Sequence, residues 1–137
     1  MVTNDIYTLV NNLVTTHETR NPFKIAREIG AIVLFVPLVK VNGFYQRYED
    51  QDIIYINEAL TEEEKILVCA HELGHALLHN DINSIFLETC KFVENKYELE
   101  ANAFAVQLLK DDLNLREELP LINWHPDNYA ILRRIIL

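Results

Sequence analysis

Three residues near the middle of the chain, His71, Glu72 and His75, form the pattern His-Glu-x-x-His. On a helix, residues four positions apart lie on the same face, so both imidazoles can reach one metal ion. Glu72 lies about a quarter turn from His71. From there it can act as a general base on a water held by the metal instead of binding the metal itself. The pattern predicts a zinc-dependent hydrolytic site.

A catalytic zinc ion usually has three protein ligands and keeps one position open for water. His79 lies one turn beyond His75 and would have to bend back, so we interpret it as a hydrogen-bonding or cleft-wall residue. Glu98 and Glu100 begin the next predicted helix, and Glu98 lies nearer to the apolar face of that helix. Asn102, one turn from Glu98, could support it by a hydrogen bond. We therefore predict His71, His75 and Glu98 as ligands, with Glu100 as the alternative to Glu98.

Two other interpretations of the histidine pair are less consistent with the sequence. If His71 and His75 were ordinary core residues, an apolar helix would bury two imidazoles and an acid, which is costly without partners. A di-iron carboxylate site would need a second Glu-x-x-His, and the chain contains only the one formed by Glu72 and His75. The mononuclear site is favoured.

The elements that position these residues follow from capping and periodicity. Thr61 and Glu64 form a capping box at the start of a predicted helix that runs to about Leu78. We expect this helix to be central because little of its surface is polar. The other expected elements are helices over 5–16, from Asn21–Pro22 to Gly30, over 96–110 and over 127–134, and strands over 32–36, 44–48 and 53–56, with a loop over 80–95.

These elements predict an α+β fold. Residues 44–48 and 53–56 should form an antiparallel hairpin around an acidic turn. We expect a small three-stranded antiparallel sheet packed against the central His-Glu-x-x-His helix and several other helices. A chain of 137 residues is long enough for one hydrophobic core, so 1–137 is predicted to be a single domain.

Composition and charge exclude several classes of protein. The net charge is −9 and the chain has no run of Lys or Arg, so direct nucleic-acid binding is not expected. No apolar stretch approaches the roughly 20 residues that span a bilayer. Residues 1–8 lack the features of a signal peptide. Cys69 and Cys90 are interpreted as buried free thiols. Together these features predict a cytoplasmic protein that contacts no membrane.

The sequence resembles the ImmA/IrrE family of metallopeptidases. The resemblance rests on three blocks, of which the third is the most specific because many families share His-Glu-x-x-His. They are Gly43-Phe44-Tyr45 continuing to Ile53-Ile54-Tyr55-Ile56-Asn57, Ala70-His71-Glu72-Leu73-Gly74-His75-Ala76-Leu77-Leu78-His79, and Glu98-Leu99-Glu100-Ala101-Asn102-Ala103-Phe104-Ala105. With the helix that begins at Asn21-Pro22-Phe23, they span about residues 20 to 110.

The resemblance implies a gluzincin-like arrangement in which His71, His75 and a glutamate of the third block bind zinc. The spacing of Glu98 and Asn102 is similar to the Glu-x-x-x-Asp of gluzincins, which favours Glu98 again. Family members commonly cleave helix-turn-helix repressors of phages and mobile elements and thereby relieve repression. The acidic chain suits a DNA-binding protein as its partner. The family often has Leu-Met-Pro where this chain has Leu108-Leu109-Lys110-Asp111, so the edge of the cleft is expected to differ.

The sequence therefore predicts that the protein is a zinc endopeptidase. In this hypothesis Glu72 takes a proton from water and later delivers it to the leaving amine. Tyr45, Arg47, Tyr55 and His79 are all candidates for stabilising the oxyanion, and the sequence does not choose among them. Two alternatives stay open: a zinc-containing binding module that sequesters a regulator without cleaving it, and a hydrolase that acts on a non-peptide bond.

Overall fold

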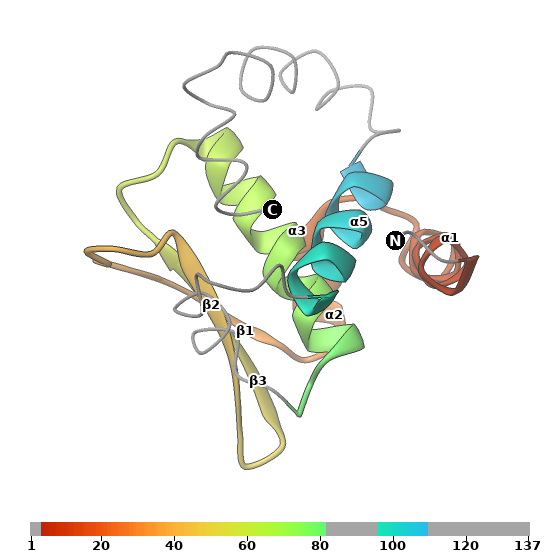
Figure 1. The fold of residues 1–137 in the computed structure, drawn as a ribbon, viewed down its shortest axis with the longest axis horizontal. Helices are drawn as coiled ribbons and strands as arrows, with labels where there is room; N and C mark the ends of the chain where they lie inside the picture. The colour runs from red at the N-terminus through yellow and green to blue at the C-terminus, as the bar shows by residue number, and fades with distance from the viewer. Residues whose placement is uncertain (1–3, 82–95, 110–137) are drawn as a thin grey trace.

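The computed structural model describes residues 4–81 and 96–109 (Figure 1). In this part of the chain every predicted helix and strand is present, and the class is α+β. The predicted helix over 127–134, most of the predicted 80–95 loop and Cys90 lie outside the described residues. The elements are α1 (Asn4–His17), α2 (Pro22–Glu28), β1 (Ile32–Val36), β2 (Gly43–Tyr48), β3 (Gln51–Asn57), α3 (Glu62–Leu78) and α5 (Lys96–Leu109).

The sheet is mixed, with strand order β1-β3-β2. β2 and β3 form the predicted antiparallel hairpin, and Glu49 and Asp50 at its turn both have positive φ, as a two-residue type I′ turn requires. β1 pairs with β3 in parallel, so the expectation that all three strands are antiparallel was wrong for β1. The connection from β1 to β2 reverses the direction of the chain, and the hairpin turn reverses it again. β3 therefore runs in the same direction as β1 and opposite to β2, and it lies between them.

Asn57 at the end of β3 holds that connection in place. Its backbone N–H donates to the carbonyl of Asn42 at 2.8 Å, and its side-chain Nδ2 donates to the carbonyl of Leu38 at 3.0 Å. The next residue, Glu58, donates its N–H to the carbonyl of Val36. These bonds satisfy backbone carbonyls that would otherwise lack partners at the edge of the sheet.

Helix α3 lies between the sheet and α5, and α1 packs on α5 from the other side (Figure 1). The residues of α3 from Leu67 to Ala76 are all buried, which agrees with the predicted central position of this helix. Gly74 lets α5 come close: a Cβ there would be 3.1 Å from Cδ1 of Phe104 and 3.2 Å from Cα of Ala101. The close approach of these two helices places the start of α5 beside the histidines of α3.

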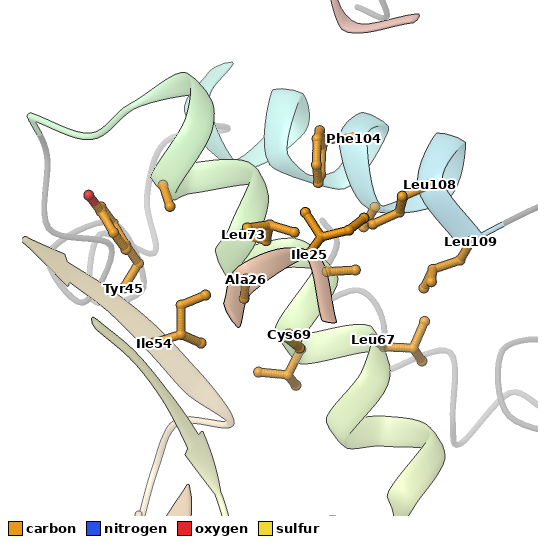
Figure 2. Packing of buried hydrophobic residues seen from close by; sticks show 14 of the residues in the cluster. Ile25, Ala26, Tyr45, Ile54, Leu67, Cys69, Leu73, Phe104, Leu108 and Leu109 are labelled. Atoms are coloured by element: carbon orange, nitrogen blue, oxygen red, sulfur yellow. The ribbon is translucent and has the colours of Figure 1, made fainter. Parts of the chain in front are cut away.

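Buried apolar side chains from the sheet and from α2, α3 and α5 meet in one cluster (Figure 2). Ile54 comes from the sheet, Ile25 from α2, Leu73 from α3 and Phe104 from α5, and all four are fully buried. The cluster therefore joins the two helices of the predicted metal site to the rest of the fold. No helix among the described residues is long and apolar enough to cross a membrane.

Replacing the N-cap residue Thr61 by alanine should destabilise the fold by about 1 kcal/mol. The N–H of Glu64 donates to Oγ1 of Thr61 at 3.2 Å, and the N–H of Thr61 donates to Oε1 of Glu64 at 2.9 Å. The substitution removes the first of these bonds. Urea unfolding would measure the effect, with Thr16→Ala on the exposed face of α1 as the control. Equal stability of wild type and Thr61→Ala would contradict the capping role.

Candidate metal centre

The structure brings His71, His75 and Glu98 together, although Glu98 lies 23 and 27 residues further along the chain. Nε2 of His71 lies 3.1 Å from Oε2 of Glu98, and Nε2 of His75 lies 2.8 Å from Oε1. Both imidazoles are fully buried and Glu98 is 8% exposed. The two histidines face α5 because they are four residues apart on α3. Glu98, in the first turn of α5, meets both.

These three side chains fit a divalent metal ion. One ligand atom from each lies within 4.8 Å of the others, and all three residues are buried. Two imidazoles and one carboxylate are the ligand set of a zinc-hydrolase site that keeps a position open for water. Such a set can hold a metal ion, and the chemistry of its atoms favours a transition metal over calcium or magnesium, which prefer oxygen ligands alone.

The electrostatics of Glu98 are consistent with a ligand. Burial opposes ionisation of its carboxyl group, but hydrogen bonds from His71 and His75 outweigh burial and lower its pKa to about 2. Glu98 is therefore a carboxylate across the physiological pH range. A buried carboxylate with both oxygens directed at imidazole nitrogens supplies the negative charge that a buried cation needs.

His79 has the hydrogen bonds predicted for it and is not part of the three-residue cluster. Its Nδ1 lies 3.1 Å from Nδ1 of His75, and its Nε2 lies 3.0 Å from Oε1 of Glu100. Burial lowers the pKa of His79, although its bond to Glu100 acts in the opposite direction. Glu100, the alternative ligand, thus contacts His79 instead of the cluster.

The contact between Glu100 and His79 was not predicted from the sequence. A signal for it was available in the spacing of four residues between His75, in the last turn of α3, and His79, the C-cap residue of that helix. The second acid, two residues after Glu98, could have been paired with His79 on that basis.

Glu72 is 1% exposed and lies next to His71 on α3. Burial raises the pKa of the neighbouring Cys69 thiol well above its usual range, and the charge of Glu72 adds to this effect. Cys69 is therefore a protonated thiol and a poor nucleophile. Its prediction as a buried free thiol is confirmed.

Asn102 is buried at 5% exposure, on the same helix as Glu98. Neither Nδ2 nor Oδ1 of its side chain has a hydrogen-bond partner within the described ranges 4–81 and 96–109. The predicted hydrogen bond from Asn102 to Glu98 is therefore not observed there. The one-turn spacing places the two side chains on one side of α5, which is not sufficient to bring their polar atoms into contact.

Three of the four oxyanion candidates have the contacts of ordinary sheet residues. Tyr45 is fully buried, and its hydroxyl donates to Oδ1 of Asp52 at 2.6 Å. Burial first, and this bond second, raise the pKa of Tyr45. Arg47 also pairs with Asp52 at 3.1 Å, and the hydroxyl of Tyr55 donates to Oε1 of Gln46 at 3.0 Å.

The chain is similar in sequence to known proteins. The family model described as the IrrE N-terminal-like domain matches residues 26–130. "Uncharacterized immunity region protein 2" of Bacillus phage phi105 is 41% identical over 105 residues, which cover 75% of this chain and 66% of that protein. Metallopeptidase ImmA of Bacillus subtilis (strain 168) is 36% identical over 116 residues, which cover 82% of this chain and 68% of that protein.

The chain thus spans about two thirds of the length of these relatives. The matched region contains α3 and α5, and with them all three residues of the His-His-Glu cluster. The family match covers more than half of the chain and agrees with the resemblance found in the three sequence blocks. The chain belongs to the family of IrrE N-terminal-like domains, the ImmA/IrrE family.

Proposed function

We propose that this protein is a zinc-dependent endopeptidase in which His71, His75 and Glu98 bind the metal and Glu72 is the general base. The observation that carries the proposal is the convergence of the two histidines and Glu98, from two helices, on one buried point. The family and the name of the Bacillus subtilis relative support a peptidase role. The complete His-Glu-x-x-His pattern argues for catalysis, because a purely structural zinc site usually closes its fourth position with Cys or His.

Zinc, when bound, would polarise the scissile carbonyl and lower the pKa of a water molecule. The protein's own residues carry out the proton transfers. Glu72 accepts the proton of the attacking water and transfers it to the nitrogen of the leaving amine, so one carboxylate serves as base and then as acid. Burial of Glu72 and of both histidines limits competing contact with bulk water.

We further propose that the substrate is a helix-turn-helix repressor of a phage or mobile element, and that cleavage in the cytoplasm relieves repression. The support is the ImmA/IrrE family together with a relative whose name places it in a phage immunity region. The net charge of −9 suits a basic DNA-binding protein as partner and disfavours direct binding to nucleic acid.

Incubating the zinc-loaded protein with a panel of purified helix-turn-helix repressors from phages and mobile elements tests this function. We expect two repressor fragments, no cleavage after zinc is removed by a chelator, and recovery of cleavage when zinc is added back. Mass spectrometry of the fragments would locate the cleaved bond. Stable binding of an intact repressor, with no fragments at any zinc concentration, would contradict the endopeptidase and favour the sequestering module.

A further inference from the structure

A chain of hydrogen bonds leads outward from the His-His-Glu cluster. The ring of His75 has a partner at each nitrogen: Nε2 lies 2.8 Å from Oε1 of Glu98, and Nδ1 lies 3.1 Å from Nδ1 of His79. Nε2 of His79 lies in turn 3.0 Å from Oε1 of Glu100. Glu100 is therefore connected to a proposed zinc ligand through one intervening ring.

The protons of this chain can be placed from its inner end. An imidazole that binds a metal ion through one ring nitrogen carries its proton on the other, so metal binding at Nε2 of His75 requires the proton on Nδ1. Nδ1 of His75 then donates to Nδ1 of His79, 3.1 Å away, which is the acceptor. The proton of His79 is therefore on Nε2, which donates to Oε1 of Glu100 at 3.0 Å.

We propose that Glu100 and His79 are positioning residues that fix the tautomer and the ring orientation of His75 for metal binding. Metal-binding histidines commonly donate their second ring N–H to a partner that sets the tautomer, and here that partner is another histidine held by a carboxylate. The inference rests on the proposed function, because it requires a metal ion at Nε2 of His75.

The contact between His75 and Glu98 is compatible with this arrangement. Nε2 of His75 and Oε1 of Glu98 lie 2.8 Å apart, so both atoms face the point at which the proposed metal ion would bind. With the proton of His75 on Nδ1, Nε2 is available to the metal.

Tyr97 restricts the ring of His79. The two rings meet edge to face, with centroids 4.8 Å apart and an angle of 75° between their planes. Tyr97 and Glu100 both belong to the first turn and a half of α5, which also carries Glu98. One short segment therefore provides a proposed ligand, the acid that orients a second ligand, and the aromatic ring that packs against the intervening histidine.

Nitrogen-15 NMR of the histidine rings in the zinc-loaded wild-type protein tests the proton arrangement directly. We expect His79 to be neutral with its proton on Nε2, and His75 to carry its proton on Nδ1. A proton on Nδ1 of His79, or a doubly protonated His79 ring, would overturn the proposal. This measurement needs no variant, so it decides the question even if a substitution prevents folding.

The zinc affinity of the Glu100→Gln variant tests whether Glu100 strengthens metal binding through His79. The amide can donate as well as accept, so it no longer requires a proton on Nε2 of His79. We expect zinc dissociation constants, measured by competition with a chromophoric chelator, to rise by roughly 10- to 100-fold. Glu58→Gln removes the same charge from an exposed residue before α3 and should leave the affinity unchanged.

The outcomes separate the two proposals. A wild-type protein that binds no zinc would defeat the proposed function itself. A wild-type protein that binds zinc and cleaves its substrate, while Glu100→Gln binds zinc within twofold as tightly, would overturn only the positioning role. Circular dichroism of each variant would establish that the fold is retained.

Discussion

Replacing Glu72 by glutamine should leave the fold and zinc binding intact and reduce peptide hydrolysis by about 10²- to 10⁴-fold, the usual contribution of a general acid–base residue. Glutamine has nearly the same shape as glutamate, so the 1% exposed site should accept it without a cavity. Its amide cannot take a proton from water. The measurement is the rate of substrate cleavage by a sample with full zinc content.

Glu63→Gln is the matched control for that experiment. It makes the same change of charge on the first turn of the same helix, away from the histidines, and should cleave like the wild type. If Glu72→Gln retained full zinc and wild-type turnover, another group would have to be the base. If it lost zinc, Glu72 would contribute to the metal site instead of acting only on the water.

Replacing Glu98 by alanine should weaken zinc binding by more than about 100-fold, beyond the loss expected for a supporting residue. The substitution removes one of three proposed ligands and the acceptor that both buried imidazoles face. It also leaves buried nitrogen atoms without that partner, which should cost on the order of 1–3 kcal/mol of folding free energy in the absence of metal. Chelator competition and urea unfolding would measure the two effects.

Glu100→Ala provides the comparison, since both glutamates lie in the first turns of α5. It should weaken zinc binding by roughly 10- to 100-fold through the loss of the His79 contact, and thus less than Glu98→Ala does. The reverse order, with Glu100→Ala abolishing binding and Glu98→Ala retaining it, would show that the ligands had been assigned wrongly.

The helices of the candidate metal centre could be predicted because their signals are local. Thr61 and Glu64 mark the start of α3 through a reciprocal pair of hydrogen bonds that involves only four residues. The position of Glu98 followed from the apolar periodicity of α5, since a residue near the buried face of a helix meets whatever that helix packs against. The structure places it against the two histidines.

The direction of β1 could not be predicted in the same way. An apolar strand such as Ile32–Val36 can pair in either direction, because its side-chain pattern is the same in both. The direction in which β1 pairs depends on the position that the later strand β3 takes in the sheet, and on the hydrogen bonds that Asn57 makes to the β1–β2 connection. These are contacts between residues about 15 to 20 apart, for which the sequence carries no periodic signal.

The hydrogen-bond partners of the three proposed ligands could also be predicted only in part. One turn of helix links Glu98 to Asn102, but spacing alone does not determine where an amide points, and no hydrogen bond joins them among residues 4–81 and 96–109. The contact of Glu100 with His79 depends on the distance between α3 and α5. That distance is set by Gly74 packing against Phe104 and Ala101, which is a tertiary feature.

We propose that His71, His75 and Glu98 hold a catalytic zinc ion. The metal content of the purified wild-type protein, measured by elemental analysis, tests this directly. We expect about one zinc ion per chain, held by three protein ligands with a fourth position open. A folded wild-type protein that contains no metal and takes up none when titrated with zinc would contradict it.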